Sequence, residues 1–260
     1  MTATLLFRSA AFAACAFICG DTMAQVVAPE VDKSRVWEPG TSSPSLPTPP
    51  EKLRQVMRSG NVRVQLGGPP PTGRESKGDD QVHATYLRPP TGRSALDAET
   101  HFSVQFSYLA KFTWSTFRTG NGRKIRIRLR FKRIKIQPQH LIWLRTPDVG
   151  PTALKRDPFW HRRLVLHELD HVRISTRLFS DEGLGKDLRG RTLITRPISD
   201  SFVINEASVQ ELVDEMVYRR FDDYMELVDI RYRELDRVTG HGRRDLPADS
   251  ALHELVRRRD

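Results

Sequence analysis

The sequence predicts an α+β fold, in which an antiparallel β-hairpin sheet packs against two helices. Apolar residues alternate with polar ones over residues 102–114 and again over 124–136, which is the period of strands that bury one face. Over residues 158–178 and 205–238, apolar residues recur at intervals of three or four, which is the period of helices with one buried face. A strand pair followed by two helices is an α+β pattern.

The first 24 residues predict a cleaved export signal. Arg8 gives a weakly positive start, Ser9 to Gly20 form a short apolar core, and Thr22-Met23-Ala24 ends in the small residue that signal peptidases prefer. The apolar run is too short to cross a bilayer, and no later stretch approaches the roughly 20 apolar residues of a transmembrane helix. We therefore expect a secreted or periplasmic protein without a transmembrane segment.

Both cysteines, Cys15 and Cys19, lie inside that signal. A lipoprotein signal would place a leucine three residues before the cysteine, but Cys15 follows Phe12-Ala13-Ala14, which argues against a lipid anchor. A mature chain without cysteine cannot use disulfides, so its stability must come from its core or from a bound metal.

Residues 25–95 are rich in Pro, Gly and Ser and poor in large apolar residues, which predicts an unfolded linker. A short helix is expected inside it, around Glu51 to Met57. The folded domain is predicted over residues 96–243. Residues 244–260 then form a tail, with one short helix around Ser250 to Arg257.

The two predicted strands form one long hairpin. The turn is predicted at Thr119-Gly120-Asn121-Gly122, because Asn and Gly tolerate the positive φ of tight hairpins. At Lys132-Arg133 the alternation slips by one residue and continues with Ile134 and Ile136 on the other parity. A β-bulge there would keep one face buried.

The outer face of the second strand is strongly basic. Its cations are Lys124, Arg126, Arg128, Arg130, Lys132, Arg133 and Lys135. In a chain of formal net charge +10, this face could hold an anionic polymer such as nucleic acid, an acidic glycan or an anionic cell-envelope surface. The alternative is a solvated face that discourages aggregation, and the absence of interleaved aromatic residues favours that alternative.

The first helix, expected to begin at Pro158 behind the capping residue Asp157, carries the motif His-Glu-x-x-His. His167 and His171 are one turn apart on the apolar stripe, so both imidazoles can bind one zinc ion. Glu168 is rotated by about 100° and lies beside the metal, where it can move a proton from a zinc-bound water to a leaving amine. The alternative is a pair of core histidines bonded to backbone or carboxylate.

A catalytic zinc site of the zincin type needs a third protein ligand, and the long helix offers candidates at both ends. Glu206 or Glu211 stands near its start, and His241 follows its end between two glycines that stop the helix and permit close approach. The length of the connecting segment allows either end to reach His171. Tyr232 is a further candidate for binding an oxyanion.

The order of these motifs resembles a bacterial family of zincin-like domains of unknown function, regarded as secreted zinc-dependent proteases. The likeness covers about Ala98 to Gly242, from the hairpin through His-Glu-x-x-His to a final Asp-x-x-Thr-x-His-Gly. The residues that match this final motif are Asp236, Thr239, His241 and Gly242. Leu235 replaces the tyrosine usual in the family, and Arg243-Arg244 stands where a Gln-Gly segment is expected.

The resemblance implies that the His-Gly segment returns to the first helix. It favours His241 as the third zinc ligand, with Asp236 and Thr239 as groups that orient the ligands. The function expected is that of a zinc metallopeptidase acting on a peptide or protein, with Glu168 as general base. The alternative is a non-catalytic cell-envelope binding module, with a structural metal site and the basic strand face as its working surface.

Overall fold

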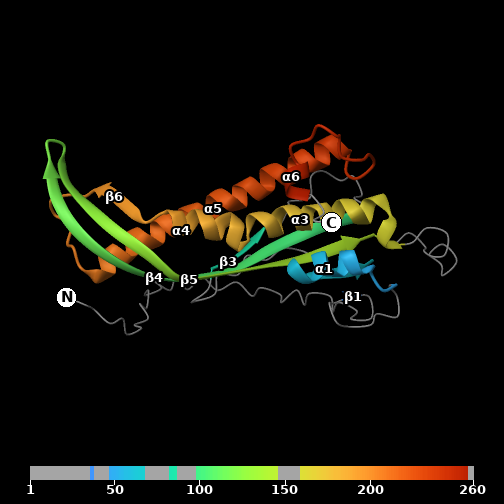
Figure 1. Ribbon diagram of the computed structural model, residues 1–260, viewed down its shortest axis with the longest axis horizontal. Helices are drawn as coiled ribbons and strands as arrows, with labels where there is room; N and C mark the ends of the chain where they lie inside the picture. The colour runs from blue at the N-terminus through green and yellow to red at the C-terminus, as the bar shows by residue number, and fades with distance from the viewer. Residues whose placement is uncertain (1–35, 38–46, 68–81, 87–97, 146–158, 257–260) are drawn as a thin grey trace, which may run out of the picture. The chain divides into compact units, whose positions relative to one another are not determined.

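One long β-hairpin forms the framework of the fold (Figure 1). Its strands are β4 (Ala98–Thr119) and β5 (Gly122–Leu144), which are paired antiparallel from the turn to their far ends. The turn at Gly120-Asn121 is the predicted one. Leu109 faces Arg133 and Ala110 faces Phe131, so Lys132 has no opposite residue. The predicted bulge at Lys132-Arg133 is therefore confirmed, and it keeps the apolar residues on one face.

The computed structural model describes the following residues: 36–37, 47–67, 82–86, 98–145 and 159–256. All of them belong to one unit, Asp32–Asp260. The predicted export signal with both cysteines lies outside the described residues, as do Asp157 and Pro158. No helix among the described residues combines the length and the apolar character needed to cross a membrane.

The sheet extends beyond the hairpin and is mixed rather than purely antiparallel. Its strand order is β1-β2-β5-β4-β3, and β6 also pairs with β5. Of these, β2 runs parallel to β5, and the other pairs are antiparallel. The added strands are β1 (Val36–Trp37), β2 (Val62–Leu66), β3 (Val82–Tyr86) and β6 (Leu193–Pro197). The prediction of an antiparallel sheet missed β2, because its partner lies nearly 80 residues away in the chain.

The prediction that residues 25–95 form an unfolded linker is wrong for residues 47–67. This segment contains β2 and α1 (Glu51–Ser59), which buries Leu53 and Met57 on one face. Both elements pack into an apolar cluster with Val172 of the first long helix. The short helix expected around Glu51 to Met57 is therefore present, but it belongs to the folded domain, because so short a helix gains stability only through contacts distant in sequence.

The two predicted helices are present with altered boundaries. The first, α3 (Arg163–Leu178), begins after a short 3₁₀ turn (Phe159–His161) rather than at Pro158. This turn is anchored by Trp160, whose indole N–H donates to the carbonyl of Pro47 at 2.6 Å. The second, α5 (Glu206–Thr239), has a capping box at its start and Gly240 in the left-handed conformation at its end.

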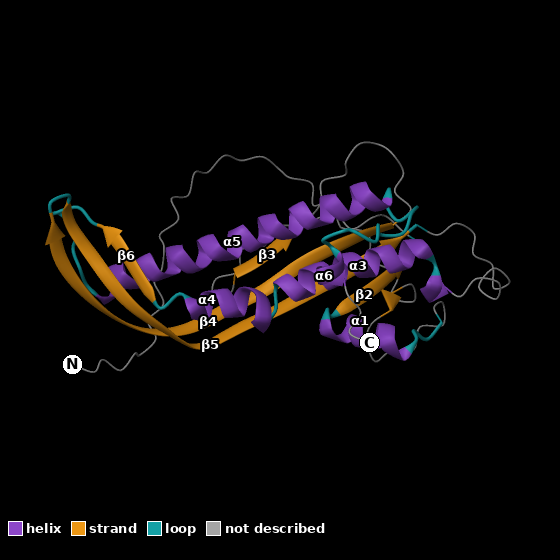
Figure 2. Cartoon of the chain, turned by 45° about the horizontal axis from the view of Figure 1, so that its top comes forward, coloured by secondary structure: helices purple, strands orange, loops and turns teal. Residues whose placement is uncertain are grey.

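Both helices pack on the same face of the sheet, and α3 contacts α5 directly (Figure 2). The larger core joins the inner residues of β4 and β5 to the buried stripe of α5. Between the helices the chain forms an irregular turn (Asp181–Gly185) and α4 (Lys186–Gly190). The C-terminal α6 (His253–Val256) is not a separate tail, because Leu252 and Val256 are buried in the same core.

Candidate metal centre

Two buried imidazoles of α3 form the base of the site. His167 and His171 are both at most 5% exposed, and their ring centroids lie 4.7 Å apart with the planes inclined at 77°. Their spacing of four residues puts them on one helix face, as the sequence predicts. They lie there beside apolar residues of the two cores, where unsatisfied polar groups are costly.

A carboxylate from the last turn of α5 completes a buried group. Asp236 Oδ1 lies 3.0 Å from His167 Nε2 and 3.2 Å from His171 Nε2. The three side chains together could bind a metal ion. The sequence predicts Asp236 as an orienting residue, whereas the structure places it directly between the two histidines.

His241 lies at the rim of this group rather than within it. Its Nδ1 is 3.4 Å from the same oxygen of Asp236, and its side chain is 52% exposed. The residue has φ +56°, between Gly240 and Gly242, which also have positive φ. The predicted return of the His-Gly segment to the first helix is therefore present, but the buried group consists of His167, His171 and Asp236.

Gly242 explains how this segment can lie against α3. A Cβ atom at this position would come within 2.9 Å of His167 Cβ and 3.0 Å of His167 Cγ. Since real Cβ atoms do not approach so closely, only glycine fits beside the imidazole. The sequence signal for this contact is the glycine that follows His241.

Thr239, predicted from the resemblance as an orienting residue, lies beside His167. Its hydroxyl donates to the carbonyl of Leu235 at 2.7 Å and lies 3.3 Å from His167 Nδ1. The same oxygen accepts the backbone N–H of Gly242 at 3.2 Å. With its proton engaged, the hydroxyl acts as acceptor for an N–H at Nδ1, which leaves Nε2 directed at Asp236.

Glu168 is buried next to the histidines and points toward the sheet. Its Oε2 accepts a hydrogen bond from the Thr100 hydroxyl of β4 at 2.6 Å. Burial alone lowers the pKa of His167, but the hydrogen bond with Asp236 and the charges of Glu168, Asp236 and Asp170 outweigh it and raise that pKa. The carboxylates of Asp236 and Glu168 thus lie beside two imidazoles, which is an electrostatic environment that favours a cation.

A row of hydrogen-bonded side chains, which the sequence analysis did not predict, lies next to His171. The ring of Tyr232 lies 4.4 Å from that of His171, and its hydroxyl donates to Ser175 Oγ at 2.9 Å. Ser175 Oγ is also 2.6 Å from Nε2 of His140, which is buried on β5. The Tyr232 hydroxyl is therefore enclosed and bonded, and it does not face a substrate. His140 has the same parity as Ile134 and Ile136 after the bulge, and this pattern could have predicted that His140 lies on the inner face of β5.

The two glutamates that the sequence offered as ligands lie at the wrong end of α5. Glu206 is the first residue of this helix and Asp236 lies in its last turn. At 1.5 Å per residue they are about 45 Å apart, and Glu211 is only about 8 Å nearer. Both glutamates are exposed. A single unbroken helix excludes them from the site.

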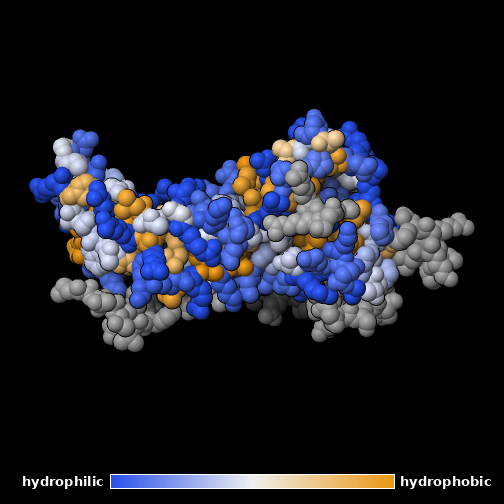
Figure 3. All heavy atoms as spheres, in the orientation of Figure 1, coloured by the Kyte–Doolittle hydropathy of each residue, from blue (hydrophilic) through white to orange (hydrophobic). Residues whose placement is uncertain are grey.

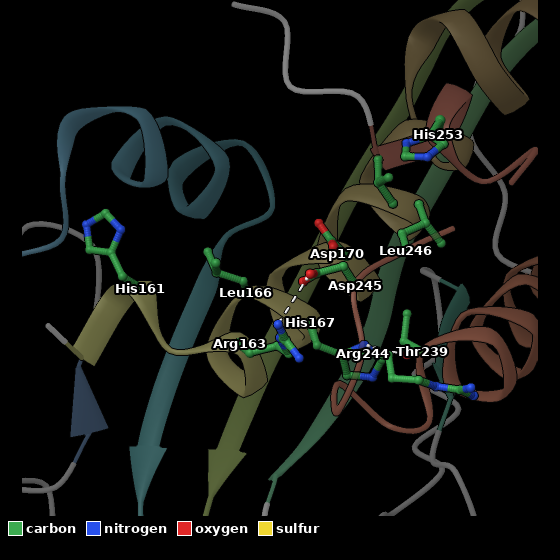
Figure 4. Close-up of a pocket in the computed structure, with 11 residues that line it drawn as sticks. His161, Arg163, Leu166, His167, Asp170, Thr239, Arg244, Asp245, Leu246 and His253 are labelled. Atoms are coloured by element: carbon green, nitrogen blue, oxygen red, sulfur yellow. Dashed lines mark hydrogen bonds and ion pairs between the residues drawn. The ribbon is translucent and has the colours of Figure 1, made fainter. Parts of the chain in front are cut away.

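An open cleft of about 640 Å³ runs alongside the buried group (Figure 4). His167 and Thr239 form part of its wall. Two acids at its border are engaged, because Asp170 pairs with Arg173 and Asp245 lies 3.3 Å from Arg163. The other lining residues are His161, Leu166, Arg244, Leu246, His253 and Val256.

No protein-family model, no curated protein and no solved structure matches this chain.

Proposed function

We propose that this chain is a zinc-dependent hydrolase of peptide bonds. In this proposal His167, His171 and Asp236 hold the metal, Glu168 moves the proton, and the packing of α3 on the sheet is zincin-like. One observation carries it: Asp236 Oδ1 lies 3.0 and 3.2 Å from the two Nε2 atoms. Ligand atoms bound tetrahedrally to zinc at about 2.0–2.1 Å lie about 3.3 Å from one another, which closely matches these distances.

The donor set suits zinc. Two imidazole nitrogens and one carboxylate oxygen form a three-ligand set typical of catalytic zinc, with the fourth position left for water. His167 is already oriented by Thr239, and the ring of His171 is held against Tyr232. Once bound, zinc would act as a Lewis acid that lowers the pKa of a bound water toward about 7 and polarises a carbonyl.

Glu168 is the residue that handles the proton. It follows His167 directly on α3 and is rotated by about 100° around the helix, so its carboxylate lies beside the metal ligands rather than among them. Thr100 donates to one of its oxygens, Oε2, and orients the carboxylate. Glu168 can then accept a proton from the attacking water and donate it to the leaving amine.

His241 decides between this proposal and the second candidate, a closed structural metal site. If His241 coordinated through Nδ1, four protein ligands would surround the ion and no position would remain for water. Burial of the other three side chains favours that candidate. The half exposure of His241 favours the hydrolase, because a side chain facing solvent can make way for substrate.

The first test measures metal content and cleavage together. Purified wild type and Glu168→Gln should each contain close to one zinc per chain by mass spectrometry of the metals. Wild type should cleave casein or unstructured peptides, and Glu168→Gln should be about 10²- to 10⁴-fold slower, as expected for loss of a general base. Glu211→Gln, at an exposed position of α5 far from the candidate site, is the matched control.

The outcomes separate the two candidates. Zinc in both proteins without cleavage of any substrate would remove the hydrolase and leave the structural site. A strong loss of zinc in His241→Ala would also indicate four protein ligands. If neither protein retains a divalent metal after reloading, both candidates fail.

A further inference from the structure

A row of cations covers the outer face of the hairpin, opposite the core. On β5 the inner residues Ile125, Ile127 and Leu129 are buried, and the residues between them are exposed. We call the exposed set the basic face. It consists of Lys111 on β4 and of Arg126, Arg128, Arg130, Arg133 and Lys135 on β5.

The side chains of the basic face carry uncompensated charge. Within the described part of the chain, none of them forms an ion pair or a hydrogen bond. Exposed arginines of the helices behave differently: Arg189 pairs with Asp181 at 2.9 Å, and Arg219 pairs with Glu215 at 2.8 Å. These two helical arginines are thus paired with acids, in contrast to the cations of the basic face.

Cross-strand neighbours add to this imbalance. Lys111 lies directly opposite Arg130, and like charges in such positions destabilise a sheet. Arg126 and Arg128 face the hydroxyl residues Ser115 and Thr113. On this face of β4, no acidic residue occurs from Ser103 to Phe117.

Protection of a sheet edge does not explain these charges. Arg126 and Arg128 lie in the part of β5 that is paired on both sides, with β4 and with β6. Cations that prevent edge-to-edge aggregation are needed on strands with a free side. Edge protection therefore does not account for these two arginines.

Apolar side chains stand among the cations. Leu109, opposite Arg133, is 41% exposed, and Leu193 of β6, opposite Arg128, is 55% exposed. The guanidinium of Arg126 lies 4.9 Å from the ring centroid of Phe117. Figure 3 shows hydrophilic and hydrophobic atoms side by side at the end of the molecule where β4 and β5 turn.

We propose that the basic face docks the protein on a membrane surface rich in anionic phospholipids. Each Lys or Arg near such a surface gains favourable electrostatic energy, and apolar side chains among them enter the headgroup boundary. A single-stranded nucleic acid would instead require a series of aromatic platforms for its bases, whereas Phe117 is a single ring and the guanidinium of Arg126 already lies over it. The two exposed leucines favour lipid over duplex DNA, whose phosphate contacts use polar groups alone.

This surface is separate from the candidate metal centre. Arg126 precedes His140 by a run of β5 that spans about 45 Å at the rise of a strand. His140 is the residue of β5 that contacts α3 through Ser175. The inference therefore does not depend on the hydrolase proposal, and it tests a different part of the chain.

The test measures sedimentation of the full chain with lipid vesicles. Wild type should bind vesicles of phosphatidylcholine mixed with phosphatidylglycerol, should not bind phosphatidylcholine alone, and should dissociate as salt is raised. The triple variant Arg126→Gln, Arg128→Gln, Arg130→Gln should bind on the order of 100-fold more weakly. The control Arg189→Gln, Arg219→Gln, Arg233→Gln removes the same charge from helical arginines paired with acids and should bind nearly as wild type.

Two further arms identify the ligand. Leu109→Asn with Leu193→Asn keeps every charge and should weaken binding to the mixed vesicles at high salt, where insertion of apolar side chains dominates. Duplex DNA and inorganic phosphate are offered separately. Equal binding by both triple variants, or tighter binding to DNA than to the vesicles, would overturn the proposal. Circular dichroism verifies that each variant is folded.

Discussion

Three consecutive residues at the end of α5 have positive φ: Gly240 at 61°, His241 at 56° and Gly242 at 76°. Glycine adopts this conformation freely, but a histidine in it is strained. Such strain persists where the surrounding structure or a function requires it. Here the turn brings His241 to Asp236 and lays Gly242 against His167, so the backbone geometry serves the candidate metal centre.

Gly242→Ala should damage the site through a single methyl group. The new Cβ would meet His167 Cβ at 2.9 Å and would also sit at φ +76°, so the turn must move away from α3. We expect the free energy of unfolding to fall by about 1–3 kcal/mol and metal affinity to fall by about 10- to 100-fold. Urea unfolding and competition with a chromogenic chelator measure the two effects. Gly190→Ala is the control, because its Cβ would meet nothing within 4 Å; equal loss in both variants would contradict the packing argument.

His241→Gly tests the backbone strain at the end of α5. Relief of left-handed strain gains about 1–2 kcal/mol, and the greater freedom of glycine in the unfolded chain costs about 0.5–1 kcal/mol. The metal-free variant should therefore unfold at the same or a slightly higher urea concentration, and the variant loaded with zinc should keep it, because His241 is not one of the three proposed ligands. Arg243→Gly, two residues further on, has no positive φ to relieve and should only be destabilised. A clear loss of stability in His241→Gly would show that relief of backbone strain contributes less free energy than the added freedom of glycine in the unfolded chain costs.

At the scale of elements, β5 and α3 are joined by a buried histidine. His140 contacts the carbonyl of Gly60 through Nδ1 and Ser175 through Nε2. Gly60 permits this close packing, since a Cβ there would come within 2.6 Å of Val172 Cγ1. The contact links α1, β5 and α3 at one point beneath His171.

This contact predicts a loss of stability in mild acid. Burial lowers the pKa of His140 to about 4, against a smaller raising effect of the hydrogen bond with Gly60. Above the unfolded-state pKa of about 6.5, both states hold a neutral imidazole and the stabilisation is complete. As pH falls from about 6.5 to about 4, only the unfolded chain takes up the proton, which removes on the order of 3 kcal/mol.

The measurement is the free energy of unfolding in urea between these two pH values. The difference between wild type and His140→Gln should shrink as pH falls, because the variant lacks this titration. His161→Gln, exposed on the short turn before α3, should follow the wild-type profile. A constant difference across the range would mean that His140 does not titrate as its burial requires.

The elements also show what could be predicted from sequence. The hairpin, its turn and the bulge at Lys132 were predictable because alternation is a local pattern. The strand β2 was not, since its parallel pairing with β5 depends on contacts distant in the chain. Likewise, helical spacing predicts that His167 and His171 lie together. Whether Asp236 or His241 joins them in the buried group depends on how the end of α5 packs against α3. That packing is a tertiary contact, and neither motif spacing nor helix length determines it.

At the scale of the whole molecule, the candidate metal centre ties two distant parts of the chain together. His167 and His171 come from α3, and Asp236 comes from the last turn of α5. In between, the chain passes through α4 and β6, and α5 then packs along the hairpin. A metal bound by all three side chains would stabilise the fold of the whole segment from His167 to Asp236, because the unfolded chain has no preformed site for the metal.

Metal removal should therefore lower the stability of the folded chain as a whole. Zinc at about 1,000 times its dissociation constant stabilises the folded state by about 4 kcal/mol, so chelation should lower Tm by several degrees or more in a domain of this size. Differential scanning calorimetry with and without a chelator measures the shift, and added zinc should restore it where magnesium does not. His167→Ala is the control: its Tm should be low from the start and unaffected by chelator. If neither chelator nor zinc changes the wild-type Tm, the hydrogen bonds among the buried His167, His171 and Asp236 are sufficient for their polar atoms. Their convergence would then serve packing rather than metal binding.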